Sequence, residues 1–402
     1  MKRISSVGVT VGALAVAGVV SLASLSTTVS AQGAAPAYRV DPFWPQPLAN
    51  HWVFGSVTGV AVDAQDHVWV VHRGADSLEA NEKGMMITPN PTSSVCCTAA
   101  PFVLELDAAG KVVSSFGGPG QGYNWPQSPG SIAVDSKGNV WITAAGLVPA
   151  PAPAGRAGGP GAGAPAAPAD AHVLKFSKTG QFLLQIGKPG LTTGDDALSK
   201  PSAVAVDAAA NEVFIADTGN RRIAVFDSET GKFKRAWGAY GEKPGADPGA
   251  YSATAPAARQ FRDVTCVDIA KDGNVYVCDR TSNRIQVFGK DGKFVKEAVI
   301  AKNTLGAVVT GQFGAVSAFG SVWDVAFSND AQQRYLFVAD GQNKKVRVLD
   351  RASLNEVGSI GQGGRQPGRF LAVGSIAVDS KGNVYTGEQH HGKRVQKFVT
   401  GR

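Results

Sequence analysis

The stretch of sequence that decides the fold is Val264-Thr-Cys-Val-Asp-Ile-Ala270, followed by Asp272-Gly-Asn-Val-Tyr-Val-Cys-Asp279, Asn283-Arg-Ile-Gln-Val-Phe288 and Gly292-Lys-Phe294. It has the pattern of two apolar strands around a polar turn, a third strand introduced by Asn-x-Arg, and a fourth that begins at Gly-Lys-Phe. The same order of elements occurs upstream, between Val204 and Phe233. Such a recurrence indicates a repeat protein rather than one irregular domain.

The first strand of this repeat occurs six times, at Val60–Asp63, Ile132–Asp135, Val204–Asp207, Thr265–Ala270, Val322–Ser328 and Ile376–Asp379. Each copy supplies four short antiparallel strands, and a lone sheet of that size would leave both of its faces exposed. Packing the sheets radially covers the faces and leaves only short, protected edges. The sequence therefore predicts an all-β protein, a six-bladed β-propeller.

The last copy of the repeat lacks a fourth strand. Its third strand, Arg394–Phe398, is followed only by residues 399–402. The segment Tyr38–Asp41, which precedes the first copy, can donate the missing strand. We therefore predict one propeller domain over residues 32–402, closed by pairing of the N-terminal strand with the C-terminal blade.

The N-terminus has the features of an export signal. Lys2 and Arg3 precede an apolar run, and Val29-Ser30-Ala31 is a small-x-small cleavage pattern. We expect residues 1–31 to be a signal peptide, the protein to be periplasmic or secreted, and no membrane span to remain after cleavage. An uncleaved membrane anchor is the alternative, because the apolar run approaches the length of a span.

Long insertions interrupt the repeats. Residues 146–171 are almost entirely Ala, Pro and Gly, a composition that cannot form a core, and we predict a disordered loop there. Residues 74–100, 238–260 and 302–320 are more mixed in composition and are candidates for ordered lids.

The formal net charge is +7, but the basic residues are scattered along the chain. A nucleic-acid partner requires a clustered basic stripe. We therefore predict no nucleic-acid partner, and a modest preference for anionic ligands.

The chain has four cysteines, and export permits disulfides. Cys266 and Cys278 lie on the two arms of one predicted hairpin, nearly equidistant from its turn. They should face each other within bridging reach, so we predict a disulfide, with a pair of small buried side chains as the alternative. Cys96 and Cys97 are consecutive and form either a vicinal pair or links elsewhere; the sequence does not choose between these.

A functional site is expected at one mouth of the central channel. The start of the first strand and the end of the second lie at the same end of an antiparallel meander, so these positions from all blades ring one mouth. The candidate ligand-binding residues at this mouth are Arg73, Asp217, Asp263, Arg280, Trp323, Asp340 and Glu388. The acidic residues recur with the repeat, so the alternative is that they cap the turns that follow them by accepting backbone N–H groups.

Three further stretches carry a family resemblance: Asp41-Pro-Phe-Trp-Pro45, Val70-Val-His-Arg-Gly74 and Asp279-Arg-Thr-Ser-Asn-Arg-Ile-Gln286. Together with the repeats, they resemble bacterial NHL-repeat propellers related to the peptidyl-α-hydroxyglycine α-amidating lyases. The resemblance extends from about Tyr38 to Phe398. It implies a six-bladed propeller of the NHL type.

The resemblance also implies a site with two arginines, a tyrosine and a zinc ion held by three histidines. Arg73 and Arg280 match the two arginines and are the candidate catalytic residues. The other positions depart from the family pattern. Where the family has its histidines and its tyrosine, this chain has Gly130, Asp263 or Thr265, Gly374, and Thr218-Gly219.

Zinc requires three or four nitrogen, sulfur or carboxylate ligands, and glycine supplies none. We therefore expect that zinc is not bound and that the zinc-dependent lyase mechanism is lost. The remaining weak candidates for metal ligands are His72, Asp263 and His390. Calcium is possible, because carboxylates are suitable ligands for it.

The sequence favours a propeller that binds a small polar, anionic or peptide-like ligand at the channel mouth through Arg73 and Arg280. One alternative is an active lyase-like or other metal-dependent enzyme with replacement ligands. A second alternative is a protein-interaction scaffold that uses the insertions. Whether the chain is an enzyme stays open at this point.

Overall fold

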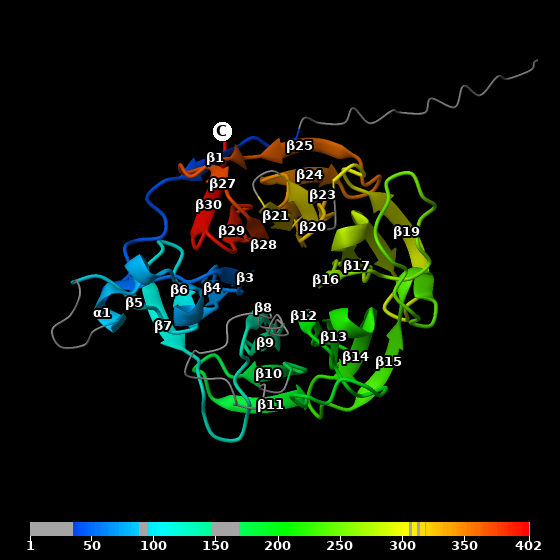
Figure 1. Cartoon of the computed structure of the whole chain (residues 1–402), viewed down its shortest axis with the longest axis horizontal. Helices are drawn as coiled ribbons and strands as arrows, with labels where there is room; N and C mark the ends of the chain where they lie inside the picture. Colours follow the sequence, from blue (N-terminus) through cyan, green and yellow to red (C-terminus); the bar gives the residue numbers. More distant parts are fainter. Residues whose placement is uncertain are drawn as a thin grey trace, which may run out of the picture. The chain divides into compact units, whose positions relative to one another are not determined.

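The computed structural model describes residues 35–87, 95–145, 169–304, 308–311, 314–317 and 319–401. These residues contain six four-stranded sheets that surround a common axis (Figure 1). Hydrogen-bonded neighbours within each of these sheets are antiparallel. The fold is therefore the predicted six-bladed β-propeller.

Each blade is a meander, counted from its innermost strand outwards. Blade one consists of β3 (Val57–Val62), β4 (Val68–His72), β6 (Val103–Leu106) and β7 (Val112–Phe116); blade two of β8 (Pro129–Val134), β9 (Val140–Ala144), β10 (His172–Phe176) and β11 (Phe182–Gly187); blade three of β12 (Pro201–Asp207), β13 (Glu212–Asp217), β14 (Arg222–Asp227) and β15 (Phe233–Trp237). Blade four consists of β16 (Val264–Ile269), β17 (Val275–Asp279), β18 (Arg284–Phe288) and β19 (Phe294–Val299); blade five of β22 (Asp324–Phe327), β23 (Tyr335–Asp340), β24 (Lys345–Asp350) and β25 (Glu356–Ile360); blade six of β28 (Val373–Val378), β29 (Val384–Glu388), β30 (Val395–Thr400) and β1 (Tyr38–Asp41).

Short elements lie in the connections between these strands. The two-residue strands form parallel pairs, β2 (Trp52–Val53) with β5 (Thr98–Ala99) and β26 (Gln362–Gly363) with β27 (Arg369–Phe370), and β20 (Val308–Gly311) forms a hairpin with β21 (Gly314–Ser317). The helical turns are η1 (Gly74–Ser77), η2 (Ala80–Glu82), α1 (Gly84–Ile87), η3 (Thr218–Asn220), η4 (Ala239–Gly241) and η5 (Arg280–Ser282).

The core lies between adjacent blades. A cluster between blades three and four combines Phe214 and Ile223 from one blade with Val264 and Phe288 from the other. Because both faces of a blade are covered, all residues of β17 are buried. This explains why the second strands have continuous apolar sequences instead of an alternating pattern.

The ring is closed by the N-terminal strand, as predicted. β1 pairs antiparallel with β30, with Tyr38 opposite Thr400 and Asp41 opposite Lys397. Trp44, which follows β1, is buried against the ring of Tyr385, with 4.9 Å between the ring centroids. The closure therefore joins the two ends of the described propeller by main-chain hydrogen bonds and by an aromatic contact.

A buried acidic residue ends the second strand in four of the blades. In blade four, Asp279 accepts the backbone N–H groups of Arg262 and Asp263 through one oxygen and the Nε–H of Arg284 through the other, the latter at 2.9 Å. The corresponding ion pairs in the other three blades are Asp217–Arg222, Asp340–Arg347 and Glu388–Arg394. Each carboxylate therefore links the second strand of its blade to the third strand or, for Glu388, to Arg394, which directly precedes the third strand.

The expectation that these acidic residues cap the following turn holds only for Asp340, which accepts the backbone N–H of Asn343. Asp217 and Asp279 instead accept backbone N–H groups from the segment that leads into the first strand.

The predicted disulfide is present. Cys266 on β16 is directly opposite Cys278 on β17, and the two are bonded. Cys96 and Cys97, whose pairing the sequence left open, are bonded to each other. Disulfides persist in oxidising compartments, which is compatible with the predicted export.

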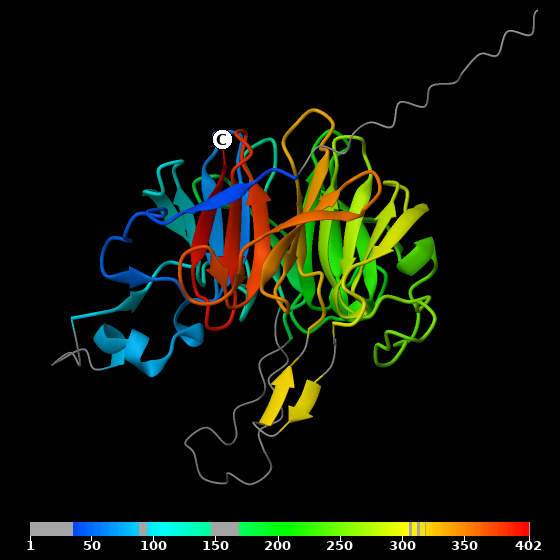
Figure 2. The ribbon, with the colours of Figure 1, turned by 90° about the horizontal axis from the view of Figure 1, so that it is seen from above.

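The long insertions all join strand ends at one face of the propeller. They connect β4 with β6, β9 with β10, β15 with β16, and β19 with β22. Figure 2 shows the β20–β21 hairpin projecting from this face. The predicted signal peptide, residues 1–31, and most of the predicted disordered loop, residues 146–171, lie outside the described residues.

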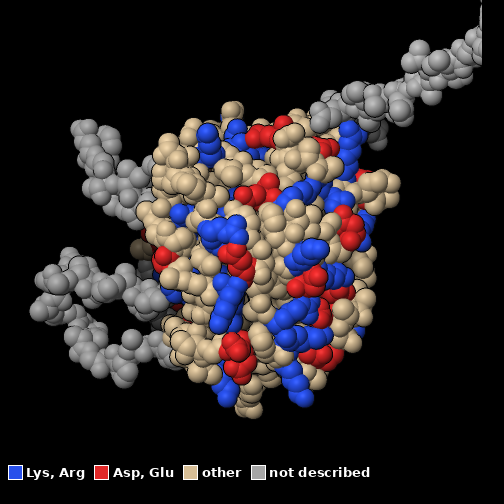
Figure 3. Space-filling view, turned by 90° about the vertical axis from the view of Figure 1, so that its right-hand side faces the viewer, with Lys and Arg blue, Asp and Glu red and all other residues tan. Residues whose placement is uncertain are grey.

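No helix among the described residues is both long and apolar enough to cross a membrane. On the side of the molecule in Figure 3, basic side chains are interspersed with acidic ones. Ion pairs between strands and turns include Lys234–Glu212 and Arg351–Asp272.

Candidate functional site

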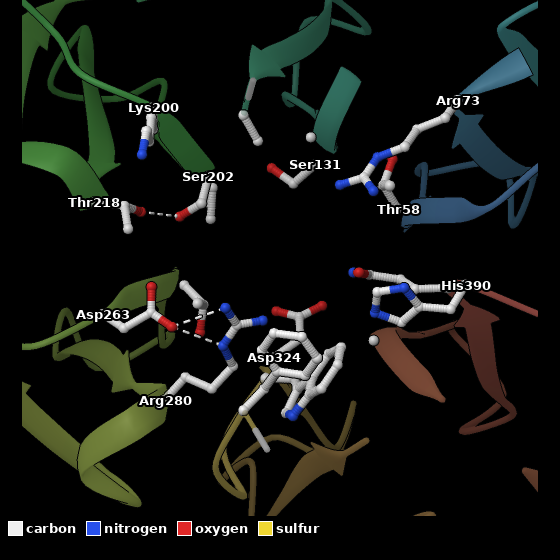
Figure 4. Close-up of a pocket in the computed structure, with 18 residues that line it drawn as sticks. Thr58, Arg73, Ser131, Lys200, Ser202, Thr218, Asp263, Arg280, Asp324 and His390 are labelled. Carbon is white, nitrogen blue, oxygen red and sulfur yellow. Dashed lines mark hydrogen bonds and ion pairs between the residues drawn. The ribbon is translucent and has the colours of Figure 1, made fainter. Parts of the chain in front are cut away.

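A cavity of about 430 Å³ lies at the channel mouth, on the face that carries the insertions. Every blade contributes to it (Figure 4). The charged and polar side chains that line it are Thr58, Arg73, Ser131, Lys200, Ser202, Thr218, Asp263, Thr265, Arg280, Asp324, Gln389 and His390, and the aromatic ones are Phe319 and Trp323.

Arg73 directly follows β4, and its backbone N–H donates to the carbonyl of Ser56. Its side chain lines the cavity, and its buried Nε has no hydrogen-bond partner among the described residues. Burial and the positive charge of Arg280 lower the pKa of Arg73, and no acidic group counteracts this shift. An anion in the cavity would compensate it.

Arg280, the second predicted arginine, is already paired. Its Nε and Nη2 each lie 2.8 Å from Oδ2 of Asp263. Its guanidinium carbon lies 4.9 Å from the ring centroid of Trp323 and 5.3 Å from that of Phe319. These contacts hold Arg280 in place, and they occupy Asp263, so Asp263 is not a free carboxylate.

Lys200 enters the cavity from blade three, and blade two lies between it and Arg73 (Figure 4). It directly precedes β12 and has a left-handed backbone with φ of 50°. Its ammonium group has no ion pair with any residue in the described part of the chain. Lys200 was not among the residues predicted from the sequence. It lies one position before Pro201, at the start of a first strand, and the expectation that such positions ring the channel mouth would have found it.

His390 is held at the edge of the cavity. Its backbone N–H donates to Ser56 Oγ at 3.0 Å, and its ring is nearly parallel to that of Phe319, at 12°. Burial lowers the pKa of His390, and the charges of Arg73 and Arg280 lower it further. His390 is therefore neutral at pH 7.

Asp324 begins β22 and faces the cavity from blade five (Figure 4). Its carboxyl accepts the backbone N–H groups of Val325 and Ile376. Burial raises the pKa of Asp324 to about 8, and the nearby Asp268 adds to the shift. Asp324 is therefore largely uncharged at pH 7 and does not cancel a positive charge in the cavity.

The structure brings together Arg73, Arg280, Asp263, Trp323 and His390 from the predicted set. It does not bring in His72, Asp217, Asp340 or Glu388. Successive side chains of a strand point to opposite sides, so the last side chain of the second strand enters the blade and the next one reaches the channel mouth. The residues that follow second strands and line the cavity are Arg73, Ala145, Thr218, Arg280 and Gln389.

His72 shows why a position at a strand end does not make a ligand. Its Nδ1 accepts the N–H groups of Gly55 and Gly74, and its Nε2 lies 2.8 Å from the carbonyl oxygen of Pro101. Burial lowers the pKa of His72 to about 4. Both ring nitrogens are used, so His72 has a structural role.

The residues of the cavity do not fit the zinc site that the resemblance implies. His390 is the one histidine among its described lining residues, and Asp263 is engaged by Arg280. At Gly130 and Gly374, the space that a side chain would need is filled by Thr143 and Gln389. Within the described ranges, the only cluster with metal-ligand geometry is Asp63, His67 and Glu105, which does not line the cavity.

Comparison with known proteins agrees with the repeat pattern. The family model "NHL repeat" matches residues 198–226 and 261–288. Peptidylglycine alpha-amidating monooxygenase of Rattus norvegicus is 27% identical over 257 residues, which is 60% of this chain and 22% of that protein. NHL repeat-containing protein 3 of Mus musculus is 26% identical over 235 residues, covering 50% of this chain and 60% of the relative.

The chain is thus a propeller with NHL repeats, distantly similar to amidating monooxygenases, and it spans less than a quarter of the length of the rat protein. Solved structures show the same fold at low identity. A Bacteroides thetaiotaomicron protein of unknown function has a TM-score of 0.53 at 14% identity, covering 87% of this chain and 70% of that one. A streptogramin B lyase structure has a TM-score of 0.50 at 11% identity, covering 90% and 98%.

The structural role of the strand-end carboxylates can be tested at Asp217. Replacing it with alanine leaves Arg222 buried without its partner, so we expect Asp217→Ala to lower the free energy of unfolding by about 3 to 5 kcal/mol. The matched control is Asp247→Ala, because Asp247 is 63% exposed in its ion pair with Arg221. Its expected cost is under about 1 kcal/mol. Equal costs in denaturant titrations would contradict the assignment.

Proposed function

We propose that this chain is an exported propeller that binds a small organic anion, such as a carboxylate, in the cavity at its channel mouth. The observation that carries the proposal is the guanidinium of the half-buried Arg73, whose Nε is buried and has no hydrogen-bond partner in the described part of the chain. Buried charges in proteins are normally paired. A bound anion would supply the missing partner.

The surroundings of Arg73 support this assignment. Ser131 lines the same cavity, and its Oγ is buried without a hydrogen-bond partner among the described residues. Lys200 adds a second positive charge. Asp263 is paired with Arg280, so its carboxylate does not compete with a bound anion for the other donors of the cavity. The cavity therefore offers donors and positive charge, and few free acceptors.

The Arg73 contact can be tested by substitution. Charge-assisted hydrogen bonds contribute about 1.5 to 3 kcal/mol, so we expect Arg73→Ala to weaken binding of the best small carboxylate by roughly ten- to a hundredfold. Arg365→Ala is the control, because Arg365 is exposed. Titration calorimetry with a panel of carboxylates measures both. The proposal fails if no carboxylate binds the unmodified protein more tightly than it binds Arg73→Ala.

Binding should also depend on pH through Asp324. Its pKa of about 8 means that the carboxyl is mostly neutral at pH 7 and becomes an anion as the pH rises. Ionised Asp324 would repel a bound carboxylate, so we expect a several-fold loss of affinity between about pH 7 and about pH 9. Asp324→Asn should flatten that profile.

Asp268 is the other carboxyl near Asp324, and burial raises its pKa to about 7. Asp268→Asn is therefore a companion variant: if it, and not Asp324→Asn, removes the pH dependence, the assignment to Asp324 is wrong. Arg73, Arg280 and His390 are the remaining titratable groups that share the cavity with Asp324, together with Lys200 and Asp263.

A second candidate is lyase activity like that of the amidating family, which the similarity to the rat amidating monooxygenase favours. The mismatch of the donor set with three-histidine zinc is the reason to rank it second. We expect the purified protein to hold no stoichiometric zinc and to release no glyoxylate from an α-hydroxyglycine peptide. Stoichiometric zinc with turnover that Arg73→Ala abolishes would reverse the ranking.

A further inference from the structure

We infer that the ligand of the channel-mouth cavity is a dianion, a short dicarboxylate whose two carboxylates bind Arg73 and Lys200. This inference rests on the proposed function and adds the charge and the length of the ligand. It follows from the number of uncompensated cations in the cavity and from the positions of those cations.

The two cations lie on different blades. Arg73 comes from blade one and Lys200 from blade three, and blade two lies between them (Figure 4). The two cations therefore enter the cavity at separate points, on either side of blade two. A ligand with an anionic group at each end can contact both at once.

The charge balance of the cavity also favours a dianion. Arg280 and Asp263 form an ion pair and cancel each other. Asp324 is largely uncharged at pH 7, and His390 is neutral. Arg73 and Lys200 therefore leave two uncompensated positive charges among the described lining residues. A monoanion would neutralise only one of these.

The wall between the two cations can bind the middle of such a ligand. Ser131, from blade two, lies between Arg73 and Lys200 in Figure 4, and its buried Oγ has no hydrogen-bond partner in the described ranges. The hydroxyls beside Lys200 differ from that of Ser131 because they are already paired: Ser202 and Thr218 both donate to the carbonyl of Val264. The free donor thus lies on the path that joins the two cations.

The inference can be tested by titrating the full chain with malonate, succinate, glutarate and adipate, and with the monomethyl ester of each. We expect at least one dicarboxylate to bind roughly ten- to a hundredfold more tightly than its monomethyl ester, since the ester loses one charge-assisted contact. Lys200→Ala should weaken binding of that dicarboxylate by a much larger factor than binding of its ester, because only the dicarboxylate loses a direct contact with Lys200.

Lys200→Gln, which keeps a long side chain, is the second variant in case Lys200→Ala alters the fold. Lys188→Ala is the control, because Lys188 is exposed and lies outside the cavity. The inference is overturned if dicarboxylates and their esters bind equally, or if Lys200→Ala weakens both to the same degree; binding lost in Arg73→Ala would still support the proposed function. If neither the dicarboxylates nor their esters bind the unmodified protein more tightly than they bind the Arg73→Ala variant, the proposed function itself fails.

Discussion

The buried ion pair at the end of the second strand is the contact on which the face with the cavity depends. In blade three, Asp217 binds Arg222 and also accepts the N–H of Ser199, which is adjacent to Lys200. In blade four, Asp279 accepts the N–H of Asp263 itself. The carboxylates that join the strands within each blade therefore also place the segments that carry charged groups of the cavity.

This arrangement separates two kinds of acidic residue that are alike in sequence. Asp217 is fully buried and satisfied by donors of its own blade, so it contributes to the stability of the fold. Asp263 and Asp324 lie at the beginnings of first strands and face the cavity. The negative charge of Asp263 is cancelled by Arg280, and Asp324 is largely uncharged at pH 7 because burial raises its pKa. The result is a cavity with positive charge although carboxyl groups line it.

The architecture could be predicted from the sequence because the same pattern of strands and turns occurs six times. The last copy lacks its fourth strand, which leaves one place for the N-terminal segment to pair. The Cys266–Cys278 bond followed from the symmetry of one hairpin. The site was predicted only in part, because a shift of one residue at a strand end turns a side chain from the cavity into the blade. Arg73 and Arg280 line the cavity as predicted, whereas Asp217 and Glu388, one position earlier at their strand ends, do not. Lys200 and the neutral state of Asp324 depend on packing between blades, which a single sequence does not reveal.

The closure of the ring also determines how the propeller can be attached to a surface or to a fused domain. β30 begins at the face with the cavity and ends at the opposite face, and β1 runs beside it in reverse, so that Gly401 donates a hydrogen bond to Ala37 there. The first and last described residues of the propeller thus emerge side by side, away from the channel mouth. A tether at either end, whether a tag on a sensor surface or a fused domain, would display the cavity outward and leave it open to ligands.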